Sequence, residues 1–329
     1  MPRYSTVSRY STCFLVWSIG CLLGIGPASA QKLPPSEQLF PSTTKGFVAV
    51  ADVGLLEQQW NKTQLGQLMA DPVMKPFTDD LRTKLEQQLG GISSRLQLNL
   101  DDLRGVPTGE VGLGAVRIAP DVAAVAVVAD VTGNLPKAEA LLKKIDADLE
   151  AKEAKRSAIA QGANAIIRFD LKPQPGEIGP PKQVFYCLAG NALVVSDNPQ
   201  LLAAVLALLP AGNNGAGSLA ATADFRAVMG RCANDGGNTM PQIRWFVEPL
   251  GYMEIVRMAT PEDRRPQEID LLRLAQTQGF DGLKGVGGFI DLAVEGFEAM
   301  HRTYVYAPGP FEKSMKMFRF PPGTDFAPQ

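Results

Sequence analysis

Histidine is nearly absent from this chain, which has His301 and no other. A histidine-based catalytic triad, or a zinc site containing histidine, would therefore have to use this one residue. His301 lies beside Arg302 in a segment that predicts a strand, and no CxxC or HxxxH spacing accompanies it. The sequence therefore assigns no catalytic residue, no metal ligand and no cofactor.

A basic surplus and long internal apolar runs are also lacking. The chain carries 32 basic and 34 acidic side chains, a net charge of −2, without the basic stripe that nucleic-acid binding requires. Beyond residue 30, the longest apolar run covers only 201–209, whereas a membrane-spanning helix needs about 20 residues. We expect no nucleic-acid partner and no transmembrane segment in the mature chain.

The first thirty residues, in contrast, have the pattern of a signal peptide. Arg3 and Arg9 give a basic start, an apolar core follows at 13–26, and Ala28-Ser29-Ala30 is the small-x-small pattern of a cleavage site. We predict cleavage after Ala30 and export to the periplasm or the extracellular space. Cleavage removes two arginines and no acid, so the mature charge is 30 − 34 = −4.

Cysteine is scarce as well, with four residues in the whole chain. Cys13 and Cys21 belong to the predicted signal peptide, so Cys187 and Cys232 remain after cleavage. An exported setting permits a disulfide between these two. The alternative is two separate buried thiols, because a free cysteine behaves as a small apolar residue. The sequence leaves both arrangements open.

The pattern of elements predicts an α+β fold. Hairpins are expected at 109–131 and 183–197, interspersed with helices such as one that stops at Gly90-Gly91 and a charged one over 135–156. This rhythm favours mainly antiparallel sheets with helices packed on one face. The predicted organisation is a linker arm at 31–45, an N-terminal half at 46–160, a C-terminal half at 161–306 and a Pro-rich tail at 307–329.

A strand that ends in an acid and passes into a helix recurs four times, at Asp52, Asp130, Asp197 and Glu248. This recurrence suggests two duplicated β-α-β-β-type units near 46–150 and 164–306. The simplest role for these acids is to cap the helices that follow them. The alternative is that they line one edge of the fold, where they could bind calcium or act as paired carboxylates in a hydrolase.

The glycine-rich stretch at 279–293 resembles a phosphate-binding loop, but its context differs from one. Lys284 precedes Gly285 and no Ser or Thr follows, so the Walker pattern fails. Ile290 stands where a dinucleotide fingerprint needs its third glycine. We predict instead a helix stop at Gly279, followed by a strand whose glycines let a backbone or an aromatic ring approach closely.

Several segments together resemble a family of uncharacterised exported bacterial proteins. They are NKTQLGQLMADPVMKPF, VPTGEVGLGAV, SLAATADFRAVM, IRWFVEPLGYMEIVR and GFDGLKGVGGF, and the resemblance covers nearly all of 40–306. It implies no activity and no catalytic residue.

The signal peptide, the ordinary charge and the lack of a catalytic signature favour one functional class. We expect a non-enzymatic binding or structural module of the cell envelope, with a protein or envelope component as its partner. The alternatives are an exported hydrolase that uses paired carboxylates and a carrier of a lipid or a hydrophobic peptide.

Overall fold

The structure is a computed structural model of the chain. It describes residues 32–97, 103–161, 164–173, 182–210, 215–234, 240–260, 270–294 and 296–319. The predicted signal peptide and cleavage site, and the tail beyond residue 319, lie outside the described residues.

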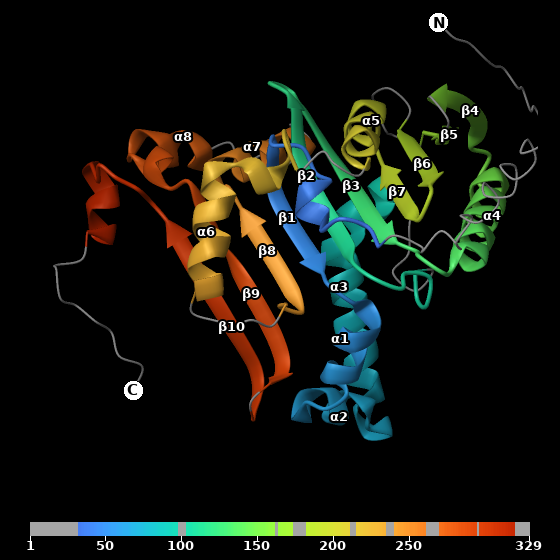
Figure 1. Ribbon diagram of the computed structural model, residues 1–329, viewed down its shortest axis with the longest axis horizontal. Helices are drawn as coiled ribbons and strands as arrows, with labels where there is room; N and C mark the ends of the chain where they lie inside the picture. Colours follow the sequence, from blue (N-terminus) through green and yellow to red (C-terminus); the bar gives the residue numbers. More distant parts are fainter. Residues whose placement is uncertain are drawn as a thin grey trace, which may run out of the picture. The chain divides into compact units, whose positions relative to one another are not determined.

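One ten-stranded sheet is built from both halves of the chain (Figure 1). Every neighbouring pair of strands is antiparallel, and the order is β10-β9-β8-β1-β2-β3-β7-β6-β5-β4. The strands are β1 (Thr44–Val50), β2 (Val111–Ala119), β3 (Val122–Asp130), β4 (Lys155–Gln161), β5 (Asn164–Asp170), β6 (Gln183–Ala189), β7 (Ala192–Ser196), β8 (Ile243–Val247), β9 (Gly285–Val294) and β10 (Phe297–Tyr306).

Helices connect these strands and confirm the α+β class. The α-helices are α1 (Val53–Trp60), α2 (Gln64–Ala70), α3 (Lys75–Leu96), α4 (Leu135–Ala151), α5 (Pro199–Leu208), α6 (Ala223–Asn234), α7 (Pro249–Ala259) and α8 (Leu271–Thr277). Short 3₁₀ turns include η1 (Ser36–Gln38), η2 (Pro72–Met74), η3 (Leu219–Ala221), η5 (Phe280–Gly282) and η6 (Lys313–Phe318).

Two element predictions are wrong in instructive ways. The helix α3 continues through Gly90-Gly91 to Leu96, because two glycines weaken a helix without preventing it when tertiary contacts hold its end. The charged helix α4 ends at Ala151, and β4 occupies 155–161. This edge strand begins with Lys155 and Arg156. In the sequence, these charged residues look like a continuation of the charged helix that precedes them.

The six strands around the β1/β8 pair are arranged symmetrically, and β7-β6-β5-β4 extend the sheet on one side. On one side lies β1-β2-β3 and on the other β8-β9-β10, and in each case a strand is followed by helices and then by a hairpin. The two first strands pair antiparallel, with Val48 opposite Trp245. The duplication of units 46–150 and 164–306 stays a prediction.

Helices cover both faces of the sheet, so the expected covering of one face is wrong. On β3, Ala124, Ala126 and Val128 belong to one buried cluster, whereas Val125 and Val127 belong to another. Successive strand residues point to opposite faces, so a continuous apolar run such as 122–129 needs cover on both. We call the face that carries Ala124, Ala126 and Val128 the strap face, and the face that carries Val125 and Val127 the α3 face.

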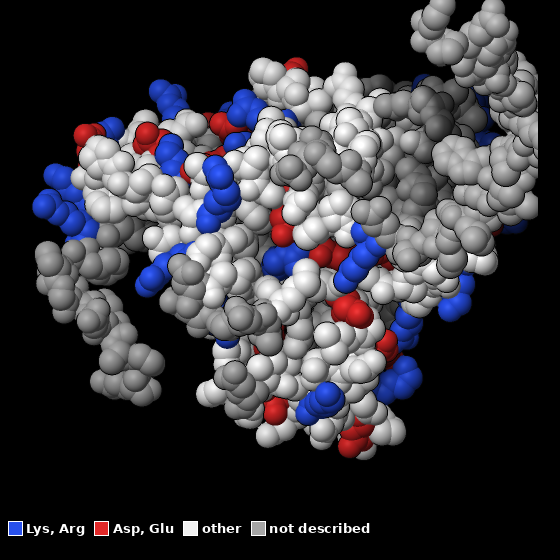
Figure 2. All heavy atoms as spheres, viewed as in Figure 1, with Lys and Arg blue, Asp and Glu red and all other residues white. Residues whose placement is uncertain are grey.

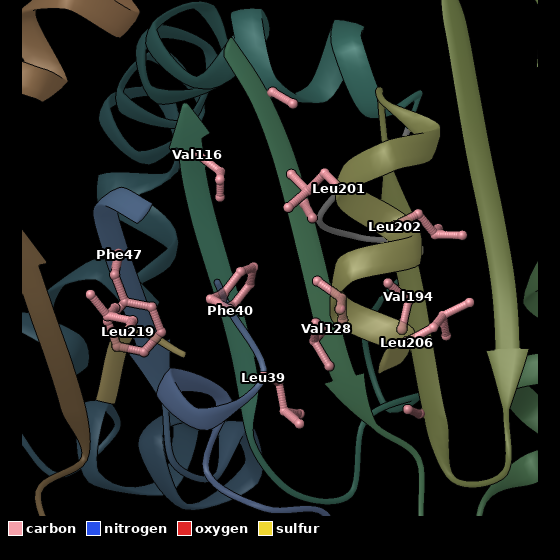
Figure 3. Packing of buried hydrophobic residues seen from close by; sticks show 14 of the residues in the cluster. Leu39, Phe40, Phe47, Val116, Val128, Val194, Leu201, Leu202, Leu206 and Leu219 are labelled. Carbon is pink, nitrogen blue, oxygen red and sulfur yellow. The ribbon is translucent and has the colours of Figure 1, made fainter. Parts of the chain in front are cut away.

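The strap face is covered by η1, η3, α5 and α6. Figure 3 shows Leu201, Leu202 and Leu206 of α5 and Leu39 and Phe40 near η1 among the residues of this cluster. The α3 face is covered by α3 and α4, whose buried residues include Leu96, Leu141, Ile145 and Leu149. In Figure 1, α5 and α6 lie in front of the sheet, and α3 lies behind it.

The segment 32–43, which falls in the predicted linker arm, packs its middle residues into the core. We call this segment the strap. Leu39 and Phe40 are 1% and 0% exposed. A Cβ atom at Gly114 would lie 2.5 Å from the Phe40 ring, so only glycine leaves room for the ring against β2. The strap is therefore an integral layer of the fold.

Candidate functional site

The four strand-end acids do not meet, because antiparallel pairing divides them between two edges of the sheet. The strands β1 and β3 end at one edge with Asp52 and Asp130, whereas β8 and β7, which pair antiparallel to them, end at the other with Glu248 and Asp197. Asp197 lies level with Val125, five positions from Asp130 along β3, or about 17 Å at the usual rise per residue. The alternative in which the four acids line one edge is therefore wrong.

Two of the four acids are helix caps, as the simplest interpretation expects. The Asp52 carboxylate accepts the Leu55 N–H at 2.8 Å and caps α1. Glu248 caps α7 by accepting the Gly251 N–H, and it pairs with Lys45 at 2.8 Å. Both carboxylates are thus committed to orphan N–H groups of a first helical turn.

The other two acids have different partners. Asp130, which is buried, accepts both the backbone N–H and the hydroxyl of Thr132. Asp197 accepts the Val125 N–H at 2.9 Å and pairs with Arg95 of α3, and Asn198 caps α5 in its place. The capping prediction is therefore wrong for both: Asp130 bonds to backbone two residues away, and Asp197 bonds to the neighbouring strand and to α3.

Burial shifts the proton affinity of one of these acids. Desolvation raises the pKa of Asp197 above its ordinary value of 3.8, and the nearby guanidinium of Arg95 and the Val125 N–H oppose this without cancelling it. This raised pKa alone does not indicate catalysis, because both partners of Asp197 belong to the packing of the fold. Among the described residues, no group of three or more His, Cys, Asp or Glu side chains could hold a metal ion.

The glycine-rich stretch is the start of a strand, as predicted. Gly279 has φ +84° and ends the α8 region, and β9 begins at Gly285. A Cβ atom would lie 2.7 Å from the Phe246 ring at Gly285 and 2.4 Å from the Trp245 carbonyl oxygen at Gly287. These glycines therefore permit close packing of β9 on β8.

No disulfide joins Cys187 and Cys232. Cys187 lies in β6 and is 1% exposed, and burial raises the pKa of its thiol. The sulphur of Cys232, in α6, lies 3.9 Å from the Gly287 carbonyl oxygen. Of the two arrangements that the sequence left open, two separate buried thiols is the one in the structure.

A buried ion cluster that the sequence analysis missed lies on the strap face. The Nη2 atom of Arg244, on β8, donates to Glu37 of the strap and to Glu110 at the start of β2, each at 2.8 Å. Burial acts to lower the pKa of Arg244, but the two carboxylates outweigh it and the pKa is raised. Figure 2 shows acidic and basic side chains side by side at the centre of this face.

The cluster fixes the strap to the sheet. Glu110 also accepts the N–H and the hydroxyl of Ser36, at 2.6 and 2.5 Å. Three segments far apart in the sequence meet there, at residues 36–37, 110–112 and 244. A Cβ atom at Gly112 would lie 2.5 Å from the Cβ of Ser36, so the strap packs closely on β2. We assign this cluster a structural role, because each of its carboxylates is held by partners within the chain. The charged residues of the cluster lie far apart in the sequence and form no local motif, so the cluster could not be recognised from the sequence.

The surface that remains without a structural explanation is the α3 face of the strands from β1 to β10. Val48 and Trp245 point to this face, because Phe47 and Phe246 beside them lie in the strap-face cluster. Val305 points to it as well, because its neighbour Tyr304 packs against the same cluster. Val48 is 36% exposed and Val305 41%, and Trp245 and Ile290 are half-buried. We call this surface the open face.

One end of the open face is bounded by α7. A Cβ atom at Gly46 would lie 2.8 Å from the Tyr252 ring, so Tyr252 packs flat on β1. Tyr252 is still 40% exposed, and Val256, one helical turn further along the same side of α7, is 47% exposed. Exposed apolar side chains of a helix and of several strands thus lie on the same side of the sheet, and exposed apolar patches mark binding sites in soluble proteins.

Comparisons with known proteins add no identification. No protein-family model matches the chain, and no curated protein or solved structure is detectably similar to it. None of the helices in the described part of the chain has both the length and the apolar character needed to cross a membrane.

Proposed function

We propose that the protein is an exported, non-enzymatic binding module of the cell envelope that holds an acyl chain on its open face. The observation that carries the proposal is the contrast between the two sides of the same strands. The strap-face side is buried under α6, whereas the α3-face side leaves Val48 and Val305 exposed. Burying apolar surface is worth about 25 cal/mol per Å², so this face attracts an apolar partner.

The chemistry of a sheet face favours an acyl chain over an extended peptide. The strands β1, β8 and β9 are hydrogen-bonded on both sides, so their backbone groups are already satisfied. The open face therefore offers side chains, and its row from Val48 through Trp245 to Gly288 carries no charge. A peptide laid there would bury unpaired N–H and C=O groups, whereas an acyl chain has none to bury.

The acidic residues give the rival hydrolase no support. A pair of carboxylates must flank a single bond to act as acid and base. The four strand-end acids are divided two and two between opposite edges of the sheet, and one acid of each two is committed as a helix cap. Asp52 and Glu248 are occupied as caps, and Asp197 is held by Arg95.

Tryptophan fluorescence tests the proposal directly, because Trp245 lies on the open face. The full chain with Trp17→Phe and Trp60→Phe keeps Trp245 as its single tryptophan. We expect a fatty acid brominated along its chain to quench this fluorescence in a saturable way. The variant Val48→Asp should weaken the binding at least tenfold, because it places a carboxylate in the apolar surface.

The matched control is Val122→Asp, since Val122 is also a strand valine that is 36% exposed, at the β2–β3 turn away from the open face. It should bind like the parent. Quenching that is absent, or that both substitutions reduce equally, would contradict acyl-chain binding at this surface.

A further inference from the structure

The strand β10 forms one end of the sheet and pairs only with β9 among the described strands. It is ten residues long, and each of its residues is exposed or half-buried. The outer side of such a strand presents N–H and C=O groups that can pair with another chain. An edge strand of this length can therefore pair with a strand of another chain.

We propose that this partner is a second copy of the chain, which pairs its own β10 antiparallel to the first about a two-fold axis at Met300. In this register Met300 faces Met300 of the second copy, and Glu298 lies directly opposite Arg302 of the second copy. Opposite charges placed across antiparallel strands stabilise the pair. The two-fold symmetry produces this charge pair twice, as isologous interfaces do.

The same register covers the exposed apolar residues of the edge. Phe297 is 60% exposed and Val305 is 41% exposed. With Met300 on the axis, Phe297 lies opposite Thr303 of the second copy and diagonal to its Val305. An aromatic side chain reaches such a diagonal neighbour. The charge pairs and the apolar contacts thus favour the same register.

The two charged side chains are already held near the edge. Glu298 accepts the Gln64 N–H at 2.6 Å. Arg302 lies 3.5 Å from Asp291, donates also to the weak acceptor Met300 Sδ, and is 22% exposed. A guanidinium has five N–H donors, so Arg302 can take a further carboxylate without leaving Asp291.

The opposite end of the sheet lacks these features. The strand β4 is shorter, with seven residues, and begins with Lys155 and Arg156 without any acid. Basic residues on an edge strand are a common protection against pairing. The comparison favours β10 as the edge that associates.

Charge reversal tests the register. The variants Glu298→Arg and Arg302→Glu each place like charges opposite one another in a homodimer, so each should be monomeric by sedimentation velocity at concentrations where the wild type is dimeric. Mixed together, they form complementary pairs at both positions, so the mixture should recover the dimer. A wild type that is monomeric throughout, or a mixture that stays monomeric, would overturn the proposal.

A second measurement covers the case in which Arg302→Glu fails to fold beside Asp291. The variant Met300→Cys should form an interchain disulfide under mild oxidation, whereas His301→Cys should not, because only residue 300 faces itself in this register. Crosslinking at 301 alone would overturn the register. The control Lys155→Glu, on β4, should leave the dimer unchanged, and its dissociation would place the interface at the wrong edge.

Discussion

The strands β3 and β10 belong to the same sheet, yet their surroundings differ. From Ala124 to Asp130 every residue of β3 is buried, because α5 covers one face and α3 the other. In β10, which α6 covers on the strap face, no residue is buried. The β3 side therefore supplies the buried core, and the β10 side carries the exposed apolar surface on which both proposals rest.

The largest effect should come from phenylalanine truncation in the two regions. Phe185 on β6 is 1% exposed, whereas Phe297 on β10 is 60% exposed. Phe185→Ala leaves a cavity and should lower the free energy of unfolding by about 3–5 kcal/mol. Phe297→Ala should change it by less than about 0.5 kcal/mol in the monomer. Urea unfolding at low protein concentration measures both, and equal effects would remove the distinction between the regions.

An intermediate effect is expected from the buried ion cluster. Glu110→Gln removes a charge that Arg244 needs, and hydrogen bonds to charged groups contribute about 1.5–3 kcal/mol. The matched substitution is Glu57→Gln, because Glu57 is 53% exposed and pairs with Arg104, itself 74% exposed. That substitution should cost less than about 1 kcal/mol. A larger loss for Glu57→Gln than for Glu110→Gln would show that the strap is not fixed by the cluster.

The smallest effect concerns pH. Because burial raises the pKa of Asp197 in the folded chain, the fold binds this proton more tightly than the unfolded chain does. The contribution of Asp197 to stability is fully present below pH 3.8 and is lost as the pH rises through the raised pKa. Relative to Asp197→Asn, the wild type should therefore lose stability as the pH rises above 3.8. Thermal unfolding across this range gives the slope, and the opposite sign would mean that Arg95 dominates.

Local patterns predicted much of the fold. The β2–β3 and β6–β7 hairpins lie within the predicted ranges 109–131 and 183–197, and Asp52 and Glu248 cap their helices as expected. These features depend on neighbouring residues, so the sequence contains the information.

Long-range features were not predictable in the same way. The sequence does not show that β8 pairs antiparallel with β1, and this pairing alone decides that Asp52 and Glu248 lie at opposite edges. The meeting of Glu37, Glu110 and Arg244 likewise depends on three separate segments. The open face could not be identified either, since Val48 and Ala49 look alike in sequence although only Ala49 is fully buried.

The pairing of β1 with β8 also has a consequence for the timing of folding. Val48 on β1 cannot pair with Trp245 on β8 until the ribosome has synthesised most of the chain. The pairing of these two strands therefore forms late. Contacts between residues so distant in sequence make folding slow. The seven neighbouring strands β1-β2-β3-β7-β6-β5-β4 are complete by Ser196, so a nascent chain can pair these first and adds β8, β9 and β10 only near the end of its synthesis.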